Sequence, residues 1–112
     1  YFLRAYHYIY LLHQFGGVPL FTAPLNPSDF GNSPRASLHE TFEFINTDLT
    51  NAIELLPEKS GYAATDLGRA TKGAAKAFLA KSLIYQIGTD SESTHTWNEV
   101  YKPKLSVREN IA

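Results

Sequence analysis

Residues 68–85 read GRATKGAAKAFLAKSLIY, and this stretch decides the fold expected for the chain. Gly68 permits a sharp turn, because glycine tolerates positive φ, and Thr71 can cap a helix by accepting from a free backbone N–H of the first turn. Small residues then keep one side of the helix narrow: Gly73, Ala74, Ala75, Ala77 and Ala80. Large apolar side chains lie further along: Phe78, Leu79, Leu83 and Ile84. A narrow face lets another helix approach closely. The stretch predicts a packing helix over residues 71–87, ended by Gly88, rather than a catalytic pocket.

The predicted partner of this helix covers residues 38–56. Ser37 and Glu40 have the spacing of a capping box, and Pro57 closes the segment. Its apolar residues recur at three- and four-residue spacing and form one stripe: Leu38, Phe42, Ile45, Leu49, Ala52, Ile53 and Leu56. Polar residues occupy the other faces, including Glu43 and Asn46. We expect the two helices to form an antiparallel hairpin, which a bulky residue at Ala77 would open.

A further helix is predicted over residues 1–15, YFLRAYHYIYLLHQF, and Gly16-Gly17 ends it. It is apolar nearly all round, which is typical of a helix buried on most sides. A strand is the alternative, since Tyr favours strands, but clean alternation is missing. Residues 16–36 form a proline-rich loop and residues 57–69 a polar one, and the sequence allows a short fourth helix over residues 96–101. The expected fold class is therefore all-α.

The composition excludes several classes of site. The 112 residues suit one domain, and the formal net charge of −1, without a Lys/Arg cluster, argues against nucleic acid or an anionic membrane surface. The absence of Cys excludes disulfides and thiolate sites. No apolar run reaches the ~18 residues of a membrane span. The chain lacks both Met and a signal peptide, so we expect a piece of a longer protein.

Two stretches resemble chemical motifs incompletely. The glycine spacing from Gly68 to Gly73 suits a phosphate loop, but Ala74 and Ala75 stand where Lys and Ser/Thr are needed. His39-Glu40-x-x-Glu43 resembles a zinc-protease helix without its second His, and a solvated helix face is the preferred interpretation. We therefore predict no catalytic, cofactor-binding or metal residue, no cofactor and no enzymatic activity.

Single charged and histidine residues are interpreted as structural. His7 and His13 are about 240° apart around a helix and cannot share a site by themselves. Arg4 and Asp48 are charges in strongly apolar helical segments, where charges are normally paired. We predict that they form an ion pair between the helices, and that Arg69 has a similar role at the start of the helix over residues 71–87.

Four aromatic residues assigned to loops are candidates for stacking on a sugar or a base: Phe21, Phe30, Tyr62 and Trp97. The alternative is that they cover the edges of the helical core. That alternative is preferred, because no pair of polar residues beside them forms a recognisable clamp. The ligand-binding residues of the chain are therefore unassigned.

Three stretches together resemble the SusD/RagB family: FLRAYHYIYLLHQFGGVPLF, RASLHETFEFINTDLTNAIELLP and GRATKGAAKAFLAKSLIY. The resemblance covers about residues 1–88, and Trp97-Asn98-Glu99-Val100 looks like the start of the family's next helix. Gly17 stands where an acidic residue is usual, and residues 102–112 depart from the pattern. Members of the family are outer-membrane nutrient-binding lipoproteins of Bacteroidetes.

The resemblance implies a scaffold of tetratricopeptide-like helix pairs, of which residues 1–112 would be a fragment. It implies a surface-exposed protein, lipid-anchored when full-length, that acts as a lid on a SusC-like TonB-dependent transporter. Such a protein captures oligosaccharides, or in some members peptides, and passes them inward without chemistry. The family's lipidated Cys is absent from this chain, and its glycan contacts lie mostly elsewhere, so no binding residue is carried over.

A free-standing tetratricopeptide-like adaptor that binds protein segments is the alternative function. Flanking sequence separates the two, because a signal peptide ending in a lipobox Cys supports the nutrient-binding protein. A start Met with further tandem repeats supports the adaptor.

Overall fold

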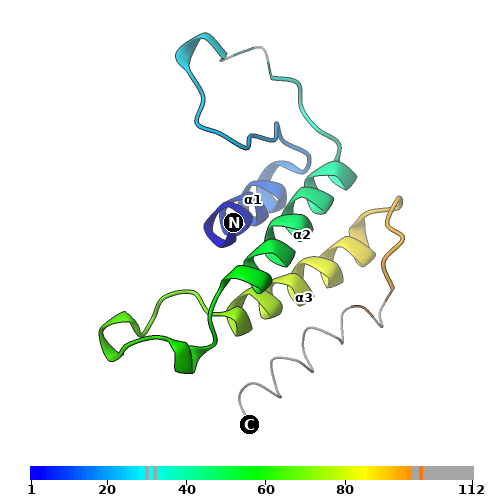
Figure 1. Cartoon of the computed structure of the whole chain (residues 1–112). Helices are drawn as coiled ribbons and strands as arrows, with labels where there is room; N and C mark the ends of the chain where they lie inside the picture. Colours follow the sequence, from blue (N-terminus) through cyan, green and yellow to red (C-terminus); the bar gives the residue numbers. More distant parts are fainter. Residues whose placement is uncertain (30, 32, 97–98, 100–112) are drawn as a thin grey trace.

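The computed structural model of the chain describes residues 1–29, 31, 33–96 and 99, and over these residues it is all-helical (Figure 1). The helices are α1 (Phe2–Phe15), α2 (Leu38–Leu55) and α3 (Lys72–Thr89). The loop between α1 and α2 contains a short 3₁₀ helix at Pro27–Asp29. The loop between α2 and α3 contains two, at Lys59–Gly61 and Ala64–Asp66. Helix α2 packs against both other helices, while α1 and α3 meet through side chains such as Phe2 and Phe78.

The predicted start signals of α2 and α3 are confirmed. The Ser37 hydroxyl accepts from the Glu40 backbone N–H at 3.1 Å, and the Glu40 carboxylate accepts from the Ser37 N–H. Thr71 accepts from the Ala74 N–H at 3.1 Å, after a turn in which Gly68 has φ 101°. Each bond satisfies a backbone donor that the first turn of a helix leaves free.

The end of α3 differs from its prediction. The helix runs through Gly88 to Thr89, and Asp90 follows as its last cap, with its backbone N–H donating to the Gln86 carbonyl at 2.8 Å. Gly88 does not adopt positive φ. It therefore does not act as the helix-ending glycine that the sequence suggested.

The core lies where α2 crosses α1, and it is built from the predicted stripe of α2. Its buried members are Ala5, Tyr8, Ile9, Leu12, Val18, Phe42, Ile45 and Leu49. On α3 the fully buried small residues are Ala75 and Ala80, whereas Ala77 is exposed. The prediction that bulk at Ala77 opens the helix pair is therefore wrong, because residues two positions apart lie about 200° apart around a helix.

Helix α1 buries one face and exposes the opposite one. Tyr8, Ile9 and Leu12 point into the core, while Leu3 and Tyr10 keep 68% and 56% of their surface exposed. The expectation that α1 is buried on most sides is thus not met within the described part of the chain. None of the helices described there has the length and hydropathy needed to cross a bilayer.

The fourth helix expected over residues 96–101 falls largely outside the described residues. Of that stretch only Thr96 and Glu99 are described. The Glu99 N–H donates to the Thr96 carbonyl at 3.0 Å, and the Glu99 carboxylate accepts from the Thr96 N–H at 3.2 Å.

Candidate functional site

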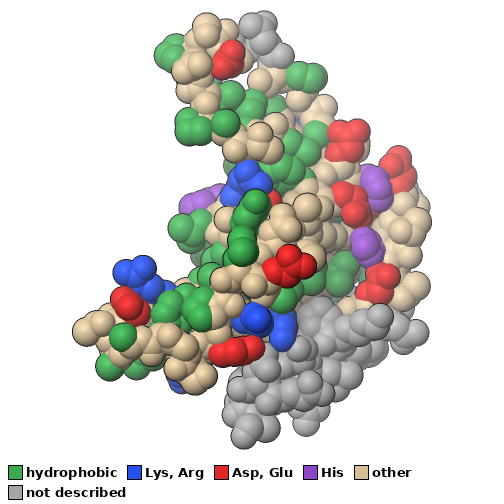
Figure 2. Space-filling view, in the orientation of Figure 1, with side chains coloured by type: hydrophobic (Ala, Val, Ile, Leu, Met, Phe, Trp, Pro, Cys, Tyr) green, Lys and Arg blue, Asp and Glu red, His purple; other side chains and the backbone are tan. Residues whose placement is uncertain are grey.

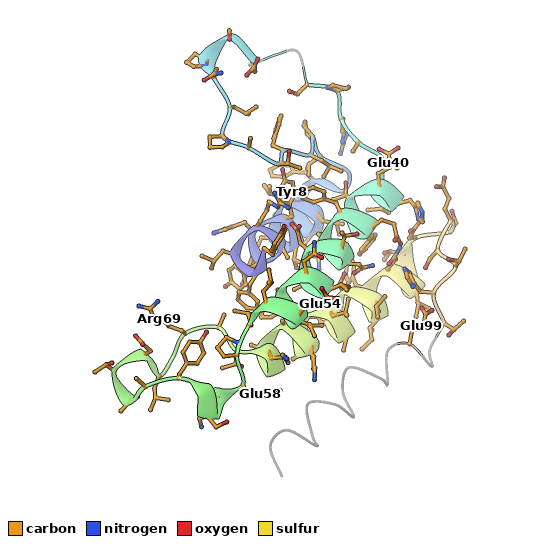
Figure 3. The ribbon with its side chains drawn as sticks, viewed as in Figure 1. Tyr8, Glu40, Glu54, Glu58, Arg69 and Glu99 are labelled. Carbon is orange, nitrogen blue, oxygen red and sulfur yellow. The ribbon has the colours of Figure 1, made fainter. Side chains whose placement is uncertain are left out.

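A cleft of about 360 Å³ opens between the long loop and the start of α2. One side comes from the chain leaving α1, and the other from the chain returning to α2. Its lining residues are Pro19, Leu20, Phe21, Ser33, Pro34, Arg35, Ala36 and Glu40. Figure 3 shows Tyr8 at the base of the protruding loop and Glu40 at the start of α2.

The two sides of the cleft are held together at the base of the loop. Gly16 adopts φ 72°, and a Cβ on Gly17 would lie 2.1 Å from the Ala36 carbonyl oxygen, so the returning chain passes close against this glycine. The Arg35 guanidinium donates to the carbonyls of Gly17 and Phe15. The base is therefore fixed by backbone contacts and one side chain.

Tyr8 links the same loop to α1. Its hydroxyl accepts from the Phe21 backbone N–H at 2.9 Å and donates to the Pro19 carbonyl at 3.3 Å. The Tyr8 ring is buried, so the backbone beside Phe21 is anchored to the core. This anchoring places Phe21 in the wall of the cleft.

The cleft combines one aromatic ring with a few polar groups, which is how small-molecule sites are usually built. Phe21 supplies the ring, and Ser33, Arg35 and Glu40 supply hydroxyl, guanidinium and carboxylate groups. A sugar offers an apolar face to a ring and hydroxyls to such groups. The arrangement can therefore bind a polar ligand.

The other aromatic candidates divide in two. The Tyr62 hydroxyl donates to the Ala70 carbonyl and so braces its own loop. Phe30 and Trp97 lie outside the described residues. Of the four aromatic residues singled out in the sequence, Phe21 is the one that the described structure places in a cleft.

The predicted ion pair between Arg4 and Asp48 is confirmed. Arg4 Nε and Nη2 each donate to one carboxylate oxygen of Asp48 at 2.6 Å, and Asp48 is only 2% exposed. The guanidinium also lies 5.0 Å from the centre of the Phe44 ring. The pair therefore ties α1 to α2 and has a structural role. Arg69 pairs with Asp66 at 3.2 Å on an exposed loop instead of anchoring α3 (Figure 3).

The histidines form no shared metal site in the described structure. The centre of the His13 ring lies 4.4 Å from the centre of the Tyr85 ring, and the His7 ring lies edge-on to the Tyr6 ring. Nδ1 of His39 contacts the Asp90 carboxylate at 2.7 Å. No three His, Cys, Asp or Glu side chains among the described residues are arranged to hold a metal ion.

A buried polar network between α2 and α3 was missed by the sequence interpretation, which placed Asn46 and Glu43 outside the apolar stripe of α2 and assigned them no partner. The Ser82 hydroxyl donates to Asn46 Oδ1 at 2.7 Å, and Asn46 Nδ2 donates to Gln86 Oε1 at 2.8 Å. Gln86 Nε2 then donates to Glu43 at 3.0 Å and to Asp90 at 3.1 Å. The four-residue spacing of Ser82, Gln86 and Asp90, which puts them on one helix face, was the available signal.

Comparison with known proteins identifies the family. Residues 1–85 match the family model SusD-like_3, described as "Starch-binding associating with outer membrane". The chain belongs to the SusD-like family. A SusD-like protein of Bacteroides ovatus is 35% identical over 92 residues, which cover 82% of this chain and 16% of that protein.

Solved structures agree with the fold of this SusD-like chain. A SusD-like carbohydrate-binding protein from Bacteroides fragilis superposes with a TM-score of 0.83 at 31% identity, covering 96% of this chain and 20% of that one. A laminarin-binding SusD-like protein gives 0.67 at 39% identity, covering 75% and 18%. The fold class is therefore all-α and tetratricopeptide-like, as predicted. The chain spans about a fifth or less of the length of these relatives.

Proposed function

We propose that this chain is part of a protein that binds glycans at the bacterial outer membrane and passes them to a SusC-like TonB-dependent transporter. The observation that carries the proposal is the family match over residues 1–85, in a family described as starch-binding and associating with the outer membrane. The name of the laminarin-binding relative supports a polysaccharide as the ligand. Family membership favours this function over that of a free-standing adaptor.

Within that protein, we assign residues 1–112 to the tetratricopeptide-like scaffold. The three helices of the described residues, with a core shared mainly between α1 and α2, suit a supporting role. The proposal includes a lipid anchor and surface exposure of the full-length protein, and it includes transport of the glycan without cleavage. The description of the matched family names binding, which supports this part of the proposal.

Isothermal titration of the full-length protein with laminarin, starch oligosaccharides and unrelated peptides tests the binding step. We expect heat of binding with at least one glycan, and chromatography of the recovered glycan should show unchanged chain length. Binding of peptides alone would contradict glycan binding. Shortened glycan would contradict transport without chemistry.

The transporter partnership needs a separate experiment. Affinity purification of the tagged full-length protein from detergent-solubilised outer membranes should recover a TonB-dependent barrel in stoichiometric amount. Recovery of the protein by itself under conditions that preserve other outer-membrane complexes would contradict the partnership, and would leave the titration result standing.

The cleft beside Phe21 is where this segment would touch a glycan. Phe21→Ala in the full-length protein should weaken glycan binding, because a sugar ring loses its stacking surface. Leu67→Ala, in the other loop at an exposed position, is the matched control. Equal affinity of the two variants would place the glycan contacts outside the cleft.

A further inference from the structure

The chain that follows α3 turns back alongside α2, and histidines and carboxylates gather there. Figure 2 shows histidine and acidic side chains together on this edge of the molecule. The contacts identify two histidines, one on each side: His39 on α2 and His95 on the returning segment. Their carboxylate partners come from α2, from the end of α3 and from the segment itself.

The geometry around His95 requires a charged ring. Nε2 lies 2.9 Å from the Glu43 carboxylate, and Nδ1 lies 2.6 Å from that of Glu99. A neutral imidazole carries one N–H, so it can donate to one carboxylate only and would turn a lone pair toward the other. Both contacts are hydrogen bonds only when His95 is protonated.

His39 makes the second contact between α2 and the chain beyond α3. Its Nδ1 lies 2.7 Å from Asp90 Oδ2, and the same carboxylate accepts from the Glu92 backbone N–H at 3.1 Å through its other oxygen. Asp90 is nearly buried, at 8% exposure. This pair therefore holds the point at which the chain leaves α3.

The two histidine sites are joined through Gln86. Its side-chain NH₂ donates both to Glu43, the partner of His95, and to Asp90, the partner of His39. Loss of either histidine's charge leaves a carboxylate that is held by Gln86 but is no longer neutralised. The charged groups that face the histidines are Glu43 on α2, Asp90 at the end of α3, and Glu92 and Glu99 on the segment.

We propose that His95 and His39 form a protonation-dependent clamp that fastens residues 90–96 to α2 and releases them as the rings lose their protons. The clamp joins the described end of the chain to the helix pair, so its release changes how the following part of the protein is attached. This inference does not depend on the proposed glycan binding.

The electrostatic environment gives the direction of the switch. The hydrogen bond to Asp90 raises the pKa of His39 above its usual value, against the opposing effect of burial. For His95, burial lowers the pKa, but the bonds to Glu99 and Glu43 outweigh it, so the pKa is raised. A raised histidine pKa stabilises the clamp fully below about pH 6.5, and this stabilisation is lost as the pH rises through the folded-state value.

Trp97, the only tryptophan of the chain, follows His95 by two positions in the sequence and serves as the fluorescence probe. We expect a transition with a midpoint above about pH 6.5 in a titration of the 112-residue chain from about pH 5 to about pH 9. Circular dichroism should show unchanged helix content through it. His95→Gln keeps a polar side chain but cannot titrate, so it should reduce the amplitude of the transition and change its midpoint, because only His39 of the clamp still titrates. His7→Gln, on α1, should leave it unchanged.

Glu43→Gln provides a second variant that preserves the shape of the network. It removes one of the two negative partners of His95, so the midpoint should move to lower pH. The clamp is overturned if wild-type fluorescence shows no transition in this range, or if His95→Gln keeps the wild-type midpoint. An unchanged midpoint in Glu43→Gln would also contradict it, whether or not His95→Gln folds.

Discussion

Among the described residues, the charge of the Asp48 carboxylate is balanced by Arg4. Its two oxygens both accept from Arg4, and almost none of its surface reaches water. Arg4→Met should therefore destabilise the chain by about 3 kcal/mol, because removing one partner leaves a buried charge uncompensated. Urea unfolding measures the change, and the double variant Arg4→Met/Asp48→Leu should recover most of it.

The exposed pair between Arg69 and Asp66 is the matched control for this prediction. Exposed ion pairs contribute little, so Arg69→Ala should change the free energy of unfolding by less than about 1 kcal/mol. If Arg4→Met and Arg69→Ala changed the free energy of unfolding equally, burial of Asp48 would not be the cause of the destabilisation in Arg4→Met.

Gly17 is limited by space rather than by backbone conformation. A Cβ there would meet backbone atoms of Ala36 and residues beyond it, which cannot rotate away as a side chain can. Gly17→Ala should therefore destabilise by roughly 1–3 kcal/mol, measured by thermal unfolding. Gly88→Ala, within α3, should instead stabilise by about 0.5–1 kcal/mol, because an added Cβ there would meet open space. If Gly17→Ala left the thermal stability unchanged, the backbone at the loop base would have to shift readily to accommodate a Cβ.

At the scale of elements, the pairing of α2 with α3 depends on Ala75 rather than on Ala77. Ala75 is fully buried, whereas Ala77 is exposed on the same helix. Ala75→Leu should lower the free energy of unfolding by about 1–3 kcal/mol through overpacking, whereas Ala77→Leu should leave it nearly unchanged. Chemical denaturation of the two variants provides the comparison, and a greater loss in Ala77→Leu would reverse this assignment of the helix faces.

The helices and their starts could be predicted because the signals are local. Ser37 with Glu40, and Thr71 before a helix-forming run, satisfy backbone donors within one turn of the chain. The face that α3 turns to α2 was harder to predict. Its small residues spread over more than half of the helix circumference, so the pattern did not distinguish Ala75 from Ala77.

The candidate site was predictable only in part. Phe21 could be singled out because an aromatic residue in a proline-rich loop is conspicuous. The cleft around it depends on Tyr8, Gly17 and Arg35 meeting across the loop base, and such contacts leave no spacing pattern in the sequence. The clamp residues were missed for the same reason, since His39 and His95 belong to segments 56 positions apart.

At the scale of the whole molecule, the histidine and carboxylate pairs are expected to contribute to how stability depends on pH. Burial opposes ionisation of Glu43 and Asp90, but hydrogen bonds from Gln86 and the histidines outweigh it and lower both pKa values. Their stabilisation is present above about pH 4 and is lost as the pH falls through the folded-state values. That of the histidines is present below about pH 6.5 and is lost at higher pH.

The midpoint of urea unfolding should therefore fall as the pH rises from about 6 to about 8. In the double variant His39→Gln/His95→Gln this slope should flatten, because neither side chain can release a proton. A slope equal to that of the wild type would assign the pH dependence to other groups.

The closed base of the long loop also bears on how relatives of this chain can diverge. Because Arg35 bonds the backbone of Phe15 and Gly17, and the Ala36 N–H donates to Val18 at 3.3 Å, both ends of the loop are fixed independently of its middle. Doubling the length of a flexible loop adds only about 0.6 kcal/mol of closure entropy. An insertion of glycine and serine after Pro24 should thus leave the circular dichroism of the helices unchanged. Evolution could lengthen or rewrite this loop to suit new ligands while the helices beneath it stay the same.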